Sequence, residues 1–304
     1  MSESPVTVPV CYRHPSKETY VRCTRCERPI CPDCMNEASV GHQCPECVAE
    51  GRRTQRSART AFGGSAAGRA GTVTKVLIGV NVFVMIASIM SGGANAVAGG
   101  GWGGLLGSDT PLTRWGAVLG GAVYGPAGEL AVHGIAGNGE WYRLITAMFL
   151  HYGVLHLLMN MYALWILGRD LERALGPLRF VALYALAGLG GNVAAYVFSA
   201  PNQSTAGAST AVFGLMAAIF VLLKRLNLSV APILPVIVIN VIFTFAVTGI
   251  SVAGHLGGLV TGGVVAAILA YAPRARRNLV QGAGLAAVFV FLMVIAIYRT
   301  LTLL

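Results

Sequence analysis

Long apolar runs separated by short polar stretches make up most of the chain from residue 73 onward. A helix needs about 20 predominantly apolar residues to cross the roughly 30 Å of hydrocarbon in a bilayer. Seven runs come close to that length: residues 73–90, 145–168, 179–199, 208–223, 228–248, 252–272 and 279–300. The pattern predicts an all-α polytopic membrane domain with seven spans over residues 73–304.

An eighth stretch, residues 115–136, is a poorer candidate for a span. It contains Pro126, Glu129, His133 and six glycines, a composition that suits a loop at the membrane surface better.

The distribution of positive charge also favours seven spans, because cytoplasmic loops carry an excess of Lys and Arg. With the N-terminus inside, the inner side holds eleven basic residues from residues 1–75 and eight from later loops. The outer side holds only Arg114, Arg143 and Arg299. An eighth span would place the N-terminal charges opposite the eight loop charges. We expect a multi-pass protein of the cell membrane with a cytoplasmic N-terminus and an external C-terminus.

Composition agrees with this interpretation. The 304 residues are 55% hydrophobic and 11% charged, with a mean hydropathy of +0.66, which excludes a pair of soluble domains. The net charge of +10 follows from basic loops beside membrane spans, so nucleic-acid binding is not expected. Nineteen Arg against three Lys, with abundant Ala and Gly, favour a GC-rich bacterial genome.

Residues 1–50 have a different character, since they hold all seven cysteines. Residues 1–10 lack the basic start and apolar core of a signal peptide, so this segment is expected to stay in the cytoplasm. Thiols remain reduced there, which favours metal binding over disulfides. Four pairs of potential metal ligands are each separated by two residues: Cys11 and His14, Cys23 and Cys26, Cys31 and Cys34, Cys44 and Cys47. Eight such donors suit two tetrahedral zinc ions.

In cross-braced modules alternate pairs share a metal. The expected sets are Cys11, His14, Cys31 and Cys34 on one ion and Cys23, Cys26, Cys44 and Cys47 on the other. Residues 11–47 resemble a B-box type zinc finger, and both ions would be structural because neither keeps an open position. His42 is either a ninth donor or a spare histidine.

Residues 51–72 are rich in Gly, Ala and Arg with no apolar period, which predicts a flexible basic linker beside the anionic inner leaflet. The zinc-finger segment, residues 1–50, could bind a cytoplasmic protein partner. A rival hypothesis makes this segment the primary module, for recruitment or ubiquitin ligation, with the spans as its membrane anchor.

Polar residues inside the spans are costly unless they are paired or functional. No Asp or Glu follows Glu172, which excludes a carboxylate proton relay in the last five spans. The remaining candidates are His151, His156, Asn160, Ser209 and His255.

Each candidate has a structural and a catalytic interpretation. His156 and Asn160 share a helical face, where they could hold one oxygen or join two helices. Ser209 follows a Gly-Ala turn at a helix start, as a nucleophile or an N-cap. Gly254, Gly258 and Gly262 form a stripe that allows close helix packing beside His255.

The depth of Ser209 favours the catalytic interpretation. From Ser209 to Leu223 a helix is about 22 Å long, shorter than the roughly 30 Å hydrocarbon core. With Lys224 at the inner face, Ser209 lies below the outer surface, where polar backbone is tolerated only in a protein or water-filled cavity.

Four motifs occur in a specific order: Trp141-Tyr142-Arg143, His151 with His156-x-x-x-Asn160, Gly207-Ala208-Ser209, and His255-x-x-Gly258-x-x-x-Gly262. On these residues, the segment from about 75 to 300 resembles the rhomboid intramembrane serine proteases. The resemblance implies a six-helix core with a seventh C-terminal helix, and cleavage of transmembrane proteins without a catalytic cofactor. It implies that Ser209 is the nucleophile and His255 the general base, with an oxyanion hole formed by His156, Asn160 and the Ser209 amide.

Two positions depart from the family pattern. Thr210 stands where the family often has Gly, and Phe213 stands where an aromatic, commonly Tyr, is found. Phe213 can still stack on the His255 ring. The alternative function is a catalytically silent rhomboid-like protein that binds membrane proteins without cleaving them or acts in their quality control.

Overall fold

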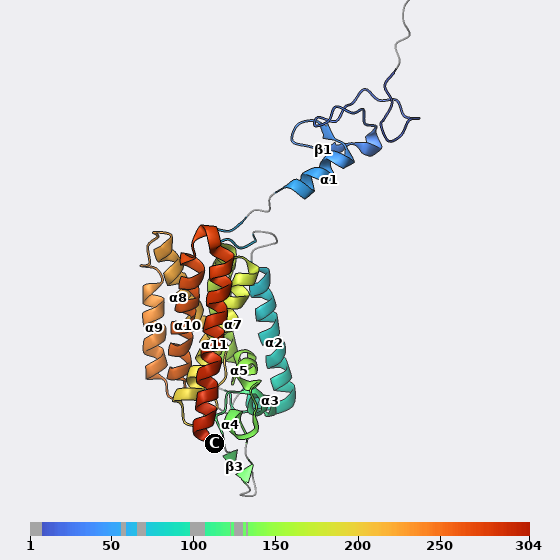
Figure 1. Cartoon of the computed structure of the whole chain (residues 1–304). Coiled ribbons are helices and arrows are strands. Elements are labelled where there is room, and N and C mark those ends of the chain that lie inside the picture. Colours follow the sequence, from blue (N-terminus) through green and yellow to red (C-terminus); the bar gives the residue numbers. More distant parts are fainter. Residues whose placement is uncertain are drawn as a thin grey trace, which may run out of the picture. The chain divides into compact units, whose positions relative to one another are not determined.

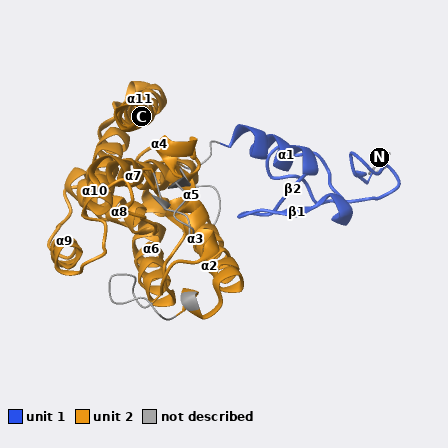
Figure 2. Cartoon of the chain, turned by 90° about the horizontal axis from the view of Figure 1, so that it is seen from below, with its two compact units in different colours: residues 1–57 blue, residues 58–304 orange. Residues whose placement is uncertain are grey.

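The computed structural model describes residues 8–55, 59–65, 71–97, 107–121, 123–124, 130–131 and 133–304. The chain forms two compact units, residues 1–57 and residues 58–304 (Figure 2). Each unit has its own buried cluster, built from cysteines in the first and from aliphatic and aromatic side chains in the second.

The smaller unit has little regular structure, because its chain turns repeatedly around the cysteines. Its elements are the 3₁₀ helix η1 (Pro32–Cys34), the antiparallel strands β1 (Asn36–Glu37) and β2 (His42–Gln43), and the helix α1 (Pro45–Thr54). Pro45 at the first helical position and the Cys44 sulfur, which accepts from the Cys47 N–H, start α1.

The predicted linker, residues 51–72, has helical residues at both of its ends. Residues 51–54 continue α1, where the basic Arg52 and Arg53 suit the negative end of the helix dipole. α2 begins at Thr72. Residues 59–65 pack on the membrane unit through the buried Phe62, whose carbonyl accepts from Gln281. Residues 56–58 and 66–70 of the linker lie outside the described residues.

Seven helices follow the seven predicted apolar runs, and Figure 1 shows them gathered in one bundle. They are α2 (Thr72–Gly92), α6 (Val154–Leu175), α7 (Pro177–Phe198), α8 (Ser209–Arg225), α9 (Leu234–Ala246), α10 (Val252–Tyr271) and α11 (Arg277–Leu303). α7, α8 and α10 pack on one another, while α9 lies at one edge of the bundle (Figures 1 and 2). The predicted all-α architecture is confirmed.

Among the described residues, four helical segments are long and apolar enough to cross a membrane: α2, α7, α10 and Arg274–Leu303. A fifth candidate joins α6 to residues 143–149, at a bend of 89°. These segments make the chain a multi-pass membrane protein. α8 and α9, with 17 and 13 residues, are shorter.

The predicted apolar run 145–168 does not form a single straight helix. Its first part forms α5 (Arg143–Thr146) and the 3₁₀ helix η4 (Ala147–Phe149). The chain is extended at Gly153 and then starts α6, which continues to Leu175. The break places His151 in the connection rather than on the helix that carries His156 and Asn160.

The predicted run 228–248 is also too long. α9 begins only at Leu234 and ends at Ala246. Pro232 and Pro235 explain the late start, because proline lacks an N–H and disfavours helical geometry in the residue before it.

Short elements fill the region between α2 and α5. They are the 3₁₀ helix η2 (Gly93–Ala96), α3 (Pro111–Gly116), the antiparallel strands β3 (Val123–Tyr124) and β4 (Leu130–Ala131), and α4 (Ile135–Asn138). The last 3₁₀ helix, η5 (Arg274–Arg276), precedes α11. Within 115–136, residues 122, 125–129 and 132 lie outside the described residues, and the described ones contain no helix longer than α3.

The sole carboxylate of α6 that is buried holds α2 in place. Glu172 accepts hydrogen bonds from the N–H groups of Val73 and Thr74 at 3.0 and 2.9 Å, and from the Thr74 hydroxyl at 2.8 Å. A carboxylate at a helix N-terminus satisfies unpaired N–H groups and complements the helix dipole. Glu172 therefore has a structural role.

Candidate active site and metal centres

Glycines bring the backbones of α8 and α10 into contact. A Cβ on Gly258 would lie 2.0 Å from the carbonyl oxygen of Thr210, and one on Gly262 would lie 2.3 Å from the Cα of Gly214. No side chain larger than hydrogen fits at either position. The glycine stripe predicted for helix packing therefore fixes the separation of the two helices that carry Ser209 and His255.

Ser209 and His255 meet at the end of this contact that lies away from Lys224 and Arg225 of α8. The Nε2 atom of His255 lies 2.8 Å from the Ser209 Oγ, within hydrogen-bonding distance. The Phe213 ring stacks on the imidazole with centroids 4.1 Å apart and planes 19° apart. Ser209 and Phe213 lie one turn apart on α8. This helix therefore supplies both the hydroxyl that contacts His255 and the ring that stacks on it.

The other nitrogen of the imidazole has a partner that the sequence analysis missed. Thr244, on α9, places its Oγ1 2.8 Å from the His255 Nδ1. The same Oγ1 lies 2.8 Å from the carbonyl oxygen of Asn240. Nothing in the sequence around Thr244 indicates this contact, because it depends on how α9 packs.

His156 and Asn160 face the same place from α6. Both line a cavity of about 120 Å³ together with Ser209 and His255. A Cβ on Gly207 would lie 3.0 Å from the His156 Nε2 and 3.2 Å from the Ser209 Oγ, so glycine leaves this space open between them. The Asn160 amide donates to the His156 carbonyl at 2.9 Å, which orients the amide along α6.

His151 lies behind this group and is 1% exposed. Its Nε2 accepts a hydrogen bond from the Ala208 N–H at 3.4 Å, in the turn before Ser209. Its ring meets that of His156 edge-on, with centroids 5.0 Å apart. His151 therefore supports the two segments that carry Ser209 and His156.

Thr210, the departure from the family pattern, is accommodated by glycines on neighbouring helices. It is 2% exposed. A Cβ on Gly191 of α7 would lie 2.6 Å from the Thr210 Cβ, and one on Gly254 of α10 would lie 3.3 Å from its Cγ2. The threonine methyl group thus occupies space that two glycines leave free.

Arg143 of the Trp-Tyr-Arg motif is 3% exposed. Its guanidinium pairs with Glu140 and donates to the carbonyls of Arg114 and Ala117 at 2.8 and 2.9 Å. This side chain ties α5 to α3 and lies among structural contacts outside the cavity.

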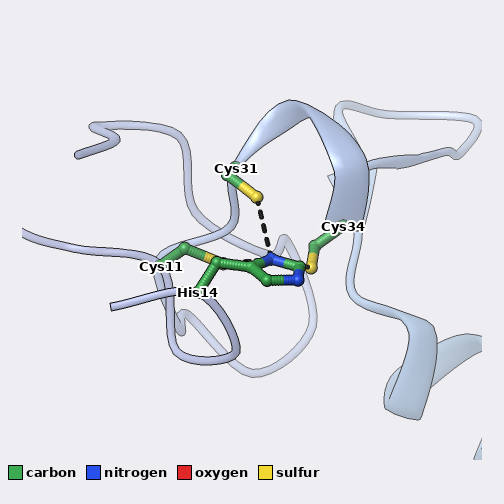
Figure 3. A group of neighbouring side chains, drawn as sticks. All are labelled: Cys11, His14, Cys31 and Cys34. Carbon is green, nitrogen blue, oxygen red and sulfur yellow. Dashed lines mark hydrogen bonds between the residues drawn. The ribbon is translucent and has the colours of Figure 1, made fainter. Parts of the chain in front are cut away.

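In the smaller unit, one group of donors joins Cys11, His14, Cys31 and Cys34, as Figure 3 shows. The His14 Nδ1 lies 3.3, 3.4 and 3.9 Å from the sulfurs of Cys31, Cys34 and Cys11. A tetrahedral zinc site places nitrogen and sulfur ligands roughly 3.6 Å apart. The group fits a zinc ion.

The second group joins Cys23, Cys26, Cys44 and Cys47, and its donor atoms also lie within 4.8 Å of one another. The sulfurs of Cys26 and Cys44 are 3.7 Å apart, near the roughly 3.8 Å of tetrahedral thiolate ligands. The two groups are those that alternate pairing predicts. His42 belongs to neither among the described residues.

Arg28 supports the four-cysteine group. Its guanidinium donates to the sulfurs of Cys26 and Cys44 at 3.3 and 3.8 Å. It also pairs with Glu46 and lies over the Tyr12 ring, 4.4 Å from its centroid. A guanidinium at this position offsets part of the negative charge that four thiolates would carry.

Backbone N–H groups prepare one thiol of each group for metal binding. Burial opposes ionisation of Cys11, but N–H groups of Cys31, Arg13 and His14 outweigh it and lower its pKa to about 6. Backbone N–H groups likewise lower the pKa of Cys23 to about 6 against the effect of burial. Thiolates are the form that binds zinc.

Comparison with known protein families matches a segment of the membrane unit. The Rhomboid domain model matches residues 138–273, which include every residue around the cavity named above. Rhomboid protease GluP of Bacillus subtilis is 43% identical over 137 residues, 43% of this chain and 27% of that protein. The match thus spans about a quarter of the length of GluP.

Two further relatives have names that differ in the activity they state. YdcA of Bacillus subtilis, named "Putative rhomboid protease YdcA", is 37% identical over 145 residues, 46% of this chain and 72% of YdcA. Inactive rhomboid protein 1 of Danio rerio is 38% identical over 82 residues, 27% of this chain and 10% of that protein.

Proposed function

The chain belongs to the rhomboid family, and we propose that it is an intramembrane serine protease with Ser209 and His255 as its catalytic dyad. The observation that carries the proposal is the 2.8 Å contact between the His255 Nε2 and the Ser209 Oγ in a cavity also lined by His156 and Asn160. The relatives named as proteases support it.

The chemistry follows from these atoms. The Ser209 Oγ attacks the substrate carbonyl carbon while its proton moves to the His255 Nε2. The carbonyl oxygen gains negative charge, which side-chain donors of His156 and Asn160 and the Ser209 N–H stabilise. His255 returns the proton to the departing amine, leaving an acyl-serine. A water molecule then repeats the sequence, and the carboxylic acid is released with Ser209 restored.

Stacking and packing position the base in this dyad. Soluble serine proteases orient their histidine with a buried aspartate. No Asp or Glu follows Glu172 here, and Phe213 on one face of the ring restricts its rotation. Close contact of α8 with α10 keeps the Ser209 Oγ and the His255 Nε2 within hydrogen-bonding distance.

The substrates would be transmembrane segments of other membrane proteins. A peptide bond inside a helix is shielded by its own hydrogen bonds, so the segment has to unwind locally before attack. Small or helix-weakening residues would mark the cleavage site, and a span of uniform Leu would resist cleavage.

The positive-inside rule assigns the N-terminus and the basic ends of α6, α7, α8 and α11 to the cytoplasm, and the C-terminus to the outside. In this orientation Ser209, at the opposite end of α8 from Lys224 and Arg225, lies toward the outer face of the cell membrane.

The smaller unit would be a cytoplasmic zinc module with two structural ions. Each group of four donors completes a tetrahedral set, which leaves no position for a substrate or reactive water. Zinc would supply the ordering free energy that so small a unit cannot obtain from apolar burial alone. A cytoplasmic protein would be its partner.

Labelling with a fluorophosphonate, read by intact mass in purified protein in lipid, tests the dyad without a known substrate. We expect one adduct on the wild type and none on Ser209→Ala or His255→Ala. Absence of an adduct on folded, zinc-loaded wild type would favour the alternative, a rhomboid-like protein that binds membrane partners without cleaving them. One relative is named inactive, which makes that outcome informative.

A further inference from the structure

Thr244 is the one buried side chain of α9. The other twelve residues of this helix are half-buried or exposed, whereas Thr244 is 2% exposed. Its hydroxyl faces His255 of α10 across the boundary between the two helices. A polar group in the most buried position of a helix that is apolar except for Asn240 indicates a specific role, because burying a hydroxyl is costly without partners.

The hydroxyl has one proton and two neighbours. The Asn240 carbonyl, 2.8 Å away, can only accept a hydrogen bond. Threonine in a helix often donates to the carbonyl four residues earlier, and Asn240 is in that position. If the Thr244 proton lies there, its oxygen is left to accept a hydrogen bond from the His255 Nδ1.

We propose that Thr244 is a positioning residue that holds His255 in the tautomer with a proton on Nδ1. The chain of bonds then runs from the Ser209 hydroxyl to Nε2, from the Nδ1 hydrogen to Thr244, and from the Thr244 hydroxyl to Asn240. This tautomer leaves the Nε2 lone pair directed at Ser209. The inference deepens the proposed protease function and rests on it.

A neutral hydroxyl suits both protonation states of the base. When Nε2 gains the serine proton, the Nδ1 hydrogen stays in place and still donates to Thr244. Ser209, Phe213 and Thr244 contact the imidazole and His156 lines the same cavity, and none of these groups is a carboxylate. Thr244 therefore takes the orienting part of the role that an aspartate has in a soluble triad, without its charge.

The test compares Thr244→Val, which keeps the shape and removes the hydroxyl, with Thr244→Ser, which keeps the hydroxyl. For Thr244→Val we expect kcat to fall by about tenfold or more with KM nearly unchanged, because a buried Nδ1–H loses its partner. Thr244→Ser should recover most of the rate. The control Thr261→Val removes a hydroxyl of α10 that packs on Gly190 of α7 instead, and should retain wild-type kcat.

A second measurement does not require turnover. In protein with ¹⁵N-labelled histidine, the His255 signals, assigned by their loss in His255→Gln, report which ring nitrogen carries the proton. We expect a protonated Nδ1 in the wild type and in Thr244→Ser, and a mixture of tautomers in Thr244→Val.

The two proposals fail in different ways. Wild-type protein that gives no fluorophosphonate adduct but shows the expected tautomers would overturn the protease proposal alone. An active wild type with a protonated Nε2, or a Thr244→Val variant with unchanged kcat and unchanged tautomer, would overturn the role of Thr244.

Discussion

The two units of this chain fix reactive side chains at short distances in opposite ways. In the smaller unit, six of the eight candidate metal ligands, all of them cysteines, form most of the buried cluster themselves, with few regular elements around them. In the membrane unit, Ser209 and His255 are 2.8 Å apart because helix backbones meet where glycines replace side chains. In the proposal above a bound ion holds the first arrangement together. The second depends on glycines, which have no side chain to keep the helices apart.

Removal of metal should show the difference between the two units most clearly. Chelation of the full-length protein with a strong zinc chelator should unfold the smaller unit, because its ligands are also its core. Hydrogen exchange of peptides from residues 8–55 should rise to the unprotected rate, while fluorophosphonate labelling of Ser209 stays unchanged. Continued protection after complete metal loss would show that the unit folds without zinc.

A methyl group between α8 and α10 should have the largest effect on the membrane unit. Gly258→Ala places a Cβ against the Thr210 carbonyl, and the helices have to move apart. We expect the Ser209 labelling rate to fall by about a hundredfold or more, since misplacement of about 1 Å costs that much.

The matched control is Gly263→Ala on the same helix. Its Cβ would meet only the Ala217 side chain, at an ordinary 3.6 Å. Labelling and thermal stability of this variant should match the wild type. Equal Ser209 labelling rates in the two glycine variants would show that the contact between α8 and α10 does not determine the geometry of the dyad.

Loss of an oxyanion donor should change the structure less, because it leaves the dyad and the contact between α8 and α10 intact. His156→Ala or Asn160→Ala should lower kcat by roughly 10²–10³ while the protein remains folded. The measurement is turnover of a transmembrane substrate in proteoliposomes, with circular dichroism to verify helix content. Wild-type kcat in both variants would refute the oxyanion assignment.

The smallest of these effects concerns the surroundings of the metal. Arg28→Ala should weaken zinc affinity of the four-cysteine group by roughly 10–100-fold, the usual effect of removing a supporting partner of metal ligands. Competition with a chromophoric chelator measures it. Arg22→Ala is the control, because the Arg22 guanidinium donates to the carbonyl of Glu27 rather than to a ligand sulfur. Equal affinities in the two variants would show that Arg28 is dispensable.

Periodic and motif-based features were predictable from the sequence. Each apolar run contains a helix, and the rhomboid resemblance carried by the motifs around Ser209 and His255 is confirmed by the family match. Both features are local: an apolar run is contiguous, and a motif is a fixed spacing. The stacking of Phe213 on His255, which the family resemblance implied, is also observed.

Features that depend on packing between elements were not predictable. The bend before α6 follows from an extended Gly153, which a hydropathy count includes in a single run. The contact of Thr244 with His255 needs the position of α9, a helix with no other buried residue. Two sets of roles stay predictions until they are measured. They are the catalytic roles of Ser209, His255, His156 and Asn160 and the structural role of zinc in the smaller unit.

The glycine contact between α8 and α10 has a consequence for chain connectivity. Ser209 is aligned with His255 by surfaces of two helices, and the mostly exposed residues 226–233 that follow α8 take no part in that contact. A break in the covalent chain there would leave both surfaces complete. Two fragments that divide at this loop could therefore assemble into one active site within a bilayer, as separately inserted helices that recognise each other.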